Sequence, residues 1–394
     1  MTDKPAKTAG VLPSQALNRM IQEEQIFTSG APPIDREEQV QPASMDLRLG
    51  SRAYRLQSSF LPQSGTVESK MKDLVMYELN LENGAILERG AVYLIPLMEK
   101  LALPEDVRGK TNPKSSTGRL DVFTRVITDY STRFEEIAQG YHGRLYLEVV
   151  PRSFTIKVKA GQRLNQLRLF TGAFPSSGEG NRERKIGIND AELSGFYKDE
   201  ELLIDHQGRF IAKPSSRLTD DGLLMGVDLA SPDDKAPIGY KAKKNSHVID
   251  LEQVGHYCAE EFWEPIFSHR ATRLILEPEE FYIFASKELI RVPLSCAAEM
   301  VEFDAGSGEL RTHYAGFFDP GFGYGKQGEV KGTKAVLEVR PHDVPFIIED
   351  GQILFKMKYE RMSHNPDIWY GAEIGSNYHN QVLRLAKQFK QIGS

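Results

Sequence analysis

One stretch in the first half of the chain brings cations and hydroxyl groups together within seven residues, Pro113-Lys-Ser-Ser-Thr-Gly-Arg119. Lys114 and Arg119 carry positive charge, Ser115 and Ser116 carry hydroxyl donors, and turn-forming neighbours let backbone N–H groups converge. This set suits an anion such as phosphate. Basic, serine-rich turns are also common on surfaces, and the GxxxxGK[ST] pattern of a P-loop is missing, so spacing alone indicates only an anion site.

A glutamate interrupts an apolar strand pattern in each half, in Leu147-Glu-Val149 and in Leu337-Glu-Val339. Strand alternation places Glu148 and Glu338 on the face opposite their apolar neighbours. A solvated face is the ordinary explanation for such a pattern. If the face lines a pocket instead, burial raises the carboxyl pKa and makes the group a proton acceptor and donor near neutral pH. The recurrence favours a chemical role.

A third candidate is the aromatic hairpin Ala315-Gly-Phe-Phe-Asp-Pro-Gly-Phe-Gly323. Its Asp-Pro-Gly core predicts a tight turn. Phe317, Phe318 and Phe322 would place rings beside backbone polar groups, so the hairpin could hold a flat heterocycle by stacking and edge hydrogen bonds. A well-packed turn without a ligand is the plainer interpretation.

Composition and charge narrow the class of protein. The chain has 394 residues, 40% of them hydrophobic, which is typical of globular domains. A net charge of −6 gives no general attraction to nucleic acid or anionic membranes. The two cysteines, Cys258 and Cys296, form neither a disulfide framework nor a zinc deaminase signature, so we expect a reducing compartment and no zinc. Without a signal sequence or long apolar run, we expect a cytoplasmic protein.

Strand patterns dominate the chain, as short runs rich in Val, Ile, Leu, Tyr and Phe between turn residues. Strands are predicted over 44–49, 91–96, 143–150 and 335–340. Helical patterns are few: residues 14–24 predict a first helix with Ser14 as its N-cap, and residues 381–390 predict a closing helix. The pattern favours an all-β class built of sandwich or barrel domains.

The order of motifs repeats along the chain, which indicates two copies of one β-domain. The matching pairs are 86–109 with 274–295, 114–119 with 306–311, 140–151 with 332–341, and 160–170 with 350–359. We predict a first domain over 1–195, a connector over 196–214 and a second domain over 215–394.

Together these motifs resemble the dCTP deaminase and dUTPase family, in the long form of its deaminase branch that carries two tandem copies of the fold. The segments that carry the resemblance are 41–50, 114–119, 143–148, 318–321, 335–338 and 370–381. The resemblance covers nearly the whole chain.

The resemblance implies distorted, dUTPase-like β-barrel domains with sites between neighbouring subunits of a trimer. It implies hydrolysis of dCTP to dUTP and ammonia without zinc. A glutamate would activate water for attack at C4 of cytosine, while a serine and an arginine orient the water and offset charge. Mg²⁺ would accompany the triphosphate, and a C-terminal segment with Tyr and Gln would close over it.

The two halves depart from the family pattern differently. The first keeps the phosphate-side motif, with Lys114 where the family usually has Arg, but has Ala138-Gln139 in place of the hairpin's Asp-Pro. The second keeps the Asp-Pro at position 319, while its phosphate-side motif, 306–311, loses a cation and a hydroxyl. We therefore predict a division of labour, in which the first half binds phosphates and the second holds the base.

The predicted catalytic residues are Glu338, Ser115 and Arg119. The predicted substrate-binding residues are Lys114, Ser116, Phe318, Asp319, Tyr370, Tyr378 and Gln381. If each half keeps its own chemistry instead, the candidates of the other site are Glu148, Ser307 and Arg311. No residue is predicted to ligate a metal.

Two other functions are compatible with the same resemblance. A dUTP diphosphatase, or an enzyme with both activities, would share the fold and the phosphate site, whereas the 370–381 tail resembles the deaminase arm. A non-catalytic sensor would bind dCTP or dTTP without turnover. The expected partner is a nucleotide, chiefly dCTP with dUTP and dTTP as other choices, in a homo-oligomer that is a trimer or dimer of two-domain chains.

Overall fold

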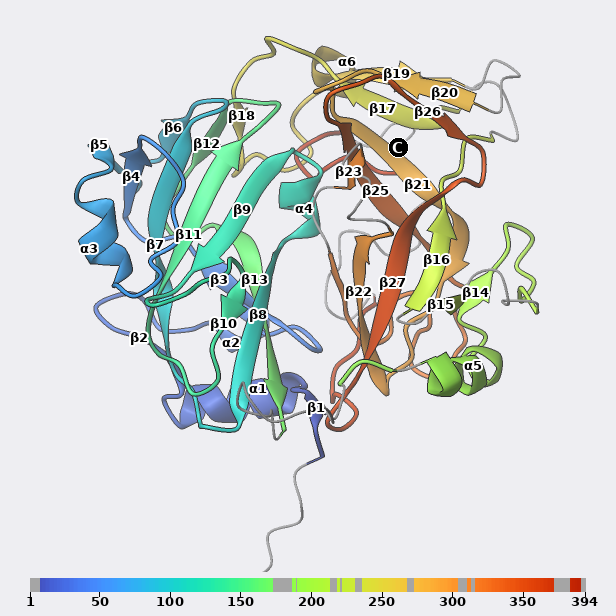
Figure 1. Ribbon diagram of the computed structural model, residues 1–394, viewed down its shortest axis with the longest axis horizontal. Coiled ribbons are helices and arrows are strands. Elements are labelled where there is room, and N and C mark those ends of the chain that lie inside the picture. The colour runs from blue at the N-terminus through green and yellow to red at the C-terminus, as the bar shows by residue number, and fades with distance from the viewer. Residues whose placement is uncertain are drawn as a thin grey trace, which may run out of the picture.

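Strands form most of the architecture, and the predicted fold class, mainly β with two tandem domains, is confirmed. The computed structural model describes residues 8–172, 186–188, 190–212, 218–219, 222–230, 236–267, 273–303, 310–312, 316–371 and 383–390. Figure 1 shows the halves side by side, the first coloured blue to green and the second yellow-green to red.

Two larger sheets and one small sheet build the first half. One sheet has the order β1 (Gly10–Val11), β13 (Arg163–Thr171), β8 (Val107–Pro113) and β10 (Glu136–Ile137), with β3 (Met45–Arg48) also on β13. The other has the order β5 (Val75–Asn80), β4 (Arg52–Leu56), β7 (Val92–Ala102), β11 (His142–Pro151) and β9 (Val122–Ile127), with β2 (Ile26–Thr28) on β7. The small sheet joins β18 (Ile249–Asp250), β12 (Ile156–Val158) and β6 (Ala85–Leu87).

The second half is built in the same way. One sheet has the order β19 (Trp263–Ile266), β17 (Gly239–Ala242), β21 (Tyr282–Ile290), β25 (Thr333–Pro341) and β23 (Leu310–Thr312), with β14 (Leu203–Ile204) on β21. The other has the order β15 (Leu218–Thr219), β16 (Gly222–Gly226), β27 (Ile353–Arg361), β22 (Cys296–Glu302) and β24 (Phe317–Phe318). A two-stranded sheet joins β20 (Arg273–Leu276) and β26 (Phe346–Glu349).

The two halves repeat one antiparallel topology, as the order of motifs predicts. In the first half β11 lies between β7 and β9, and in the second half β25 lies between β21 and β23. Glu148 faces Leu94 across its ladder, and Glu338 faces Ile283 in the equivalent ladder. The repeated glutamates therefore occupy equivalent strand positions. The domain boundaries given above stay a prediction.

Short helices connect the strands. They are α1 (Ser14–Gln22), α2 (Arg36–Gln39), α3 (Val67–Met71), α4 (Ser115–Gly118), α5 (Asp190–Asp199) and α6 (Ala259–Phe262). The prediction of Ser14 as the first N-cap is wrong by one residue: Pro13 is the N-cap, because its carbonyl already accepts hydrogen bonds from the N–H groups of Ala16 and Leu17.

The predicted closing helix is wrong for its described part, residues 383–390, which contain a single turn at 386–389 and no helix. The backbone there bonds to another segment instead: the N–H groups of His256 and Tyr257 donate to the Gln388 carbonyl, and the Lys390 N–H donates to the Tyr257 carbonyl. Phe389 is buried against the rings of Phe262 and Trp263, so this segment is held by tertiary packing rather than by its own helical bonds.

The hydrophobic cores of the halves interpenetrate. The cluster built on the first half also contains Tyr240, Phe262, Trp263 and Phe281 of the second half, and Phe389 from the chain end. The second half has its own cluster between its two larger sheets. The hydrophobic core of the first half is therefore complete only with residues that come from beyond position 236.

Replacing Phe389 with alanine should lower the free energy of unfolding by about 3–5 kcal/mol, the usual cost of truncating a buried phenylalanine. Urea unfolding followed by tryptophan fluorescence measures this change, since Trp263 lies in the same cluster. Met76→Ala, at a side chain 56% exposed, is the matched control and should change the free energy little. Equal effects of the two variants would contradict this packing.

Candidate active site

The phosphate-side motif forms a sharp turn between two strands. Strand β8 ends at Pro113, Lys114 caps α4 in an extended conformation, and the N–H groups of Thr117 and Gly118 donate to the Lys114 carbonyl. Arg119 follows and is only 2% exposed. Its Nη1 donates to the Arg384 carbonyl at 2.9 Å, which ties this turn to the chain end.

A cavity of about 840 Å³ opens beside α4 and is lined by both halves of the chain. The lining from the first half includes Asp46, Lys114, Ser115, Ser116, Arg119 and Arg163. The lining from the second half includes Phe318, Asp319, Phe322, Glu338, Tyr370 and Lys387. The structure thus brings together every predicted residue of the composite site that lies within its described residues. Figure 1 shows α4 at the border between the halves.

The Glu338 carboxyl lies directly against α4. A Cβ atom added at Gly118 would stand 2.7 Å from Oε2 and 3.0 Å from Oε1 of Glu338, so a side chain at position 118 would collide with the carboxyl. Position 118 needs glycine because of this close approach, not because of its backbone angles. The contact crosses from one half to the other and places the carboxyl beside the hydroxyls and the arginine of the motif.

Burial raises the pKa of Glu338 well above its ordinary value. The Arg119 guanidinium opposes this shift and the negative charge of Asp121 adds to it. Only 4% of Glu338 is exposed, so water does not stabilise its anion. A carboxyl of this kind can both accept and return a proton near neutral pH.

The predicted hairpin is held in place by the first half. Arg168 Nη2 lies 3.3 Å from Asp319 Oδ1 and donates to the Phe318 carbonyl at 3.3 Å, while Ser44 Oγ donates to Asp319 Oδ2 at 3.3 Å. The Arg168 guanidinium also stacks 4.1 Å from the Phe317 ring centre. Burial raises the pKa of Asp319, and Arg168 opposes that shift.

Aromatic rings pack behind the hairpin. The rings of Phe318 and Phe322 meet edge to face at 4.9 Å, and those of Phe322 and Tyr370 lie 5.3 Å apart. The Tyr370 N–H donates to the Pro320 carbonyl at 2.8 Å. Gly321, at φ +96°, allows this approach, because a Cβ there would be 2.9 Å from the Tyr370 nitrogen. These contacts give the cavity one apolar wall.

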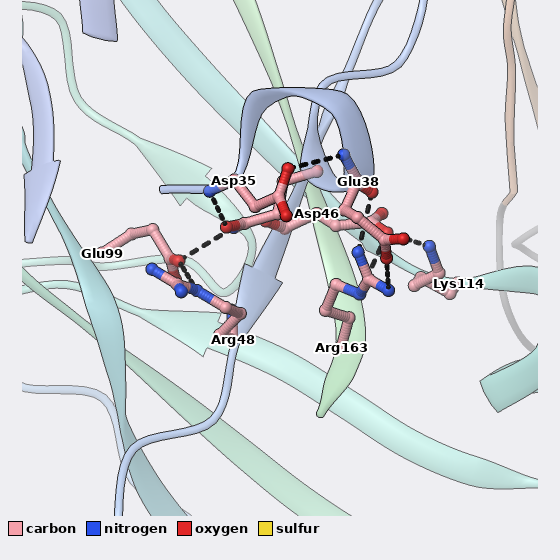
Figure 2. A network of polar contacts seen from close by, with 8 residues as sticks. Asp35, Glu38, Asp46, Arg48, Glu99, Lys114 and Arg163 are labelled. Atoms are coloured by element: carbon pink, nitrogen blue, oxygen red, sulfur yellow. Dashed lines mark hydrogen bonds and ion pairs between the residues drawn. The ribbon is translucent and has the colours of Figure 1, made fainter. Parts of the chain in front are cut away.

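A second wall of the cavity carries cations paired with carboxylates. Lys114 forms an ion pair with Asp46, and Arg163 Nη2 lies 2.8 Å from Glu38 Oε2. Figure 2 shows that Lys114, which follows β8, and Arg163, which begins β13, approach Asp46 and Glu38 on one side of the network, while Arg48 and Glu99 form the other side.

A buried amide connects the two sides of this network. Gln39 donates from one nitrogen to the Asp46 carbonyl at 2.9 Å and to Glu99 Oε1 at 3.0 Å. Arg48 Nε lies 2.7 Å from the same oxygen of Glu99, which is fully buried. The backbone at Asp46 is therefore held firmly behind the cationic wall.

Lys387 and Arg163 are site residues that the sequence analysis missed. Both line the cavity, and burial together with the neighbouring charges of Lys114 and Arg163 lowers the pKa of Lys387. Four cations, with Arg119, thus gather around one cavity, which suits a ligand with several negative charges. Arg163 stands in a segment that repeats between the halves, but nothing in its local pattern indicates a site.

Comparison with known proteins shows the family to which the chain belongs. Residues 8–173 match the model of the 2′-deoxycytidine 5′-triphosphate deaminase N-terminal domain, and residues 195–389 match that of its C-terminal domain. The crystal structure of 2′-deoxycytidine 5′-triphosphate deaminase from Agrobacterium tumefaciens is 42% identical, with a TM-score of 0.80 over 91% of this chain and 97% of that chain. The chain belongs to the dCTP deaminase family.

Two curated relatives match about half of the chain each. The dUMP-forming dCTP deaminase of Methanothermobacter thermautotrophicus is 28% identical over 198 residues, 49% of this chain and 96% of the relative. The dCTP deaminase of Halorubrum lacusprofundi is 27% identical over 190 residues, 44% of this chain and 88% of the relative. The predicted family, the enzyme class and the activity in nucleotide metabolism, dCTP deamination, are confirmed.

The second family glutamate, Glu148, lies outside this cavity. Its Oε1 forms an ion pair with Arg125, whose Nε stands 3.0 Å away. The Arg125 guanidinium is stacked 4.6 Å from the Phe123 ring centre and 3.5 Å from that of Phe134. Only 1% of Glu148 is exposed. In the first half the buried glutamate is thus paired with an arginine, whereas Glu338, its counterpart in the second half, has no ion-pair partner among the described residues.

Some candidate residues lie outside the described residues. These are Ser307, Tyr378 and Gln381, together with the side chain of Arg311. Among the residues that are described, no three His, Cys, Asp or Glu side chains are grouped to hold a metal ion, and no helix is long and apolar enough to span a membrane.

Gly118→Ala should reduce deamination of dCTP at least tenfold while leaving the chain folded, because the new methyl group displaces the Glu338 carboxyl from α4. Release of ammonia measures the rate and circular dichroism the fold. Gly195→Ala is the matched control, since a Cβ there meets nothing within 4 Å. Full activity of Gly118→Ala would show that the contact between Glu338 and α4 is dispensable.

Proposed function

We propose that the cavity between the halves is one composite deaminase site that converts dCTP and water to dUTP and ammonia without zinc. The observation that carries the proposal is the buried Glu338 carboxyl, supplied by the second half and set against α4 of the first half in a cavity lined by cations. Neither half alone contains this combination among its described residues.

Glu338 acts as the proton carrier. As the water oxygen bonds to C4 of cytosine, Glu338 accepts a proton from the water and passes it to N3. It then carries the hydroxyl proton to the amino nitrogen, the C4–N4 bond breaks, and ammonia leaves a C4 carbonyl behind. The raised pKa of Glu338 supports both directions of transfer, since a carboxyl of higher proton affinity can both accept a proton and return it.

Ser115 and Arg119 assist from α4. The Ser115 hydroxyl orients the water, and the Arg119 guanidinium offsets the negative charge that develops at the addition step. Arg119 is preorganised for this role, because the Arg384 carbonyl and its burial hold it in place. Little reorganisation is therefore needed during the reaction.

The triphosphate and the base occupy opposite walls of the cavity. Lys114, Ser116, Arg163 and Lys387 contact the phosphates, and the hairpin with Phe318, Asp319 and Tyr370 borders the base. Asp46 and Glu38 neutralise Lys114 and Arg163 in the structure, and binding of the triphosphate replaces part of these ion pairs. Tyr378 and Gln381 complete the closing segment in this proposal.

Magnesium would enter with the triphosphate. Mg²⁺ keeps several waters and is usually bound by phosphates plus one or two carboxylates rather than by a protein cage. The Asp46 and Glu38 carboxylates at the cationic wall fit that role. The ion would neutralise phosphate charge, while the proton transfers at C4 depend on side chains of the chain itself.

Glu338→Gln should abolish release of ammonia from dCTP, with a loss of at least about 10²-fold in kcat, because the amide cannot accept the proton. Glu148→Gln is the matched control and should retain activity, since Glu148 lies outside the cavity. Both variants are assayed with dCTP and Mg²⁺ by ammonia release, and their melting temperatures are compared.

Loss of activity in Glu148→Gln with full activity in Glu338→Gln would overturn the composite site. Binding of dCTP without any turnover by the unmodified protein would instead favour the nucleotide sensor.

A second candidate function follows from the relatives. Several of them are named dUMP-forming dCTP deaminases, so the same cavity could also cleave the triphosphate and release dUMP and pyrophosphate. Parallel assays of ammonia and pyrophosphate with dCTP, and of pyrophosphate with dUTP, separate the cases. Ammonia without pyrophosphate supports dUTP as the product, and equal amounts support the bifunctional enzyme.

Lys387→Met should raise KM for dCTP about tenfold and change kcat little, because the side chain contacts the phosphates and not the reacting carbon. Steady-state kinetics at constant ionic strength measure both values. Lys390→Met, at an exposed lysine in the same segment, is the control and should leave KM unchanged. A fall in kcat with unchanged KM would place Lys387 near the chemistry instead.

The cytoplasmic location and the assembly of two-domain chains into a trimer or dimer stay predictions. Every described residue of the proposed site comes from one chain.

A further inference from the structure

Asp121 combines two features that are individually costly. It is a fully buried carboxylate, and its backbone lies in the left-handed region at φ 54°. Glycine adopts that conformation without strain, and burying a carboxylate costs several kcal/mol unless it is paired. Burial also raises the pKa of Asp121, although Arg340 and Ser153 oppose the shift. The side chain at this turn must therefore make a contact that offsets these costs.

That contact crosses between the halves. Asp121 forms an ion pair with Arg340 of β25, and Ser153 Oγ donates to Asp121 Oδ2 at 2.6 Å. Arg340 Nη2 also donates to Ser153 Oγ at 3.1 Å. Arg340 stands two residues after Glu338 on the same face of the strand, and Asp121 stands two residues after Arg119. The pair thus lies beside the site without lining the cavity.

The first half has no arginine at the position equivalent to Arg340. Val150 follows Glu148 by two residues, so no cation comes from that strand position, and Arg125 from the neighbouring strand pairs with Glu148 directly. In the second half an arginine does stand two residues from Glu338, but its guanidinium is engaged by Asp121. Among the described residues, Glu338 has no ion-pair partner.

We propose that Asp121 is a positioning residue of the deaminase: by holding Arg340, it keeps that guanidinium away from the Glu338 carboxyl and fixes β25 against α4. This inference rests on Glu338 being the proton carrier proposed above. In the first half the equivalent glutamate is itself bound by an arginine, since Arg125 Nε lies 3.0 Å from Glu148 Oε1.

The charges around the pair give the expected pH dependence. Arg119 and Asp121 are the charged groups that act on Glu338, the first lowering and the second raising its pKa. Arg152 and Arg340 act on Asp121, and Glu279 borders Arg340 on its outer side, next to His342. Asp121→Asn removes a negative charge and takes away the ion-pair partner that holds Arg340, leaving it only its contacts with Ser153 and Glu279. Both changes favour the ionised form of Glu338. Arg340→Met removes only the positive partner.

The test is the pH profile of kcat/KM for dCTP in the unmodified enzyme, Asp121→Asn, Arg340→Met and the double variant. Since Glu338 must be ionised to accept a proton, kcat/KM falls as pH drops through its pKa. Asp121→Asn should move this acid limb to lower pH by about one unit. Arg340→Met should leave it in place or move it to higher pH, and the double variant should return towards the unmodified enzyme.

If the ion pair were merely structural, both single variants would have lower activity and the acid limb of the pH profile would stay at the same pH. That result would overturn the inference, and so would a shift of the acid limb in the same direction in both single variants. The titration of dCTP itself is common to all four proteins and cancels in the comparison. The Glu338→Gln variant tests the proposed composite site separately. If that site were wrong, Glu338→Gln would remain active in an assay in which the unmodified enzyme deaminates dCTP.

Discussion

The site depends on keeping one carboxyl out of water between two halves of a chain. Glu338 is supplied by β25, and the backbone of α4 at Gly118 covers it so closely that a methyl group would not fit. Desolvation at this junction raises the proton affinity of the carboxyl, which is the property that acid–base chemistry near neutral pH requires. Gly118 and Glu338 belong to different halves, so the register between the halves is part of the proposed chemistry.

Polar contacts, together with the shared core, set that register. Asp121 pairs with Arg340 near Glu338, Arg168 bonds to Asp319 at the hairpin, and Lys110 Nζ lies 2.5 Å from Glu299 Oε1 farther along β8. Each pair joins the first half to the second. Directional ion pairs of this kind specify orientation more than they add stability, because desolvation offsets much of their attraction.

Local patterns in the sequence predicted the strands, the repeat, the α4 motif and the hairpin, since each depends on residues close in the chain. The resemblance supplied the pairing of α4 with Glu338, and the structure places them together. Arg163 and Lys387 were missed because their role comes from long-range packing that no local spacing records. The closing helix was predicted wrongly for the same reason: Phe389 belongs to a core more than a hundred residues away, and that core overrides helical propensity.

The interpenetrating cores have an evolutionary consequence. Because Trp263, Phe281 and Phe389 complete the interior of the first half, the duplicated units are no longer interchangeable modules. A gene that lost either unit would encode a fragment with an unfilled interior. The shared interior thus ties the two units together, because removing one unit either takes away Trp263, Phe281 and Phe389 or strips them of the apolar side chains that cover them.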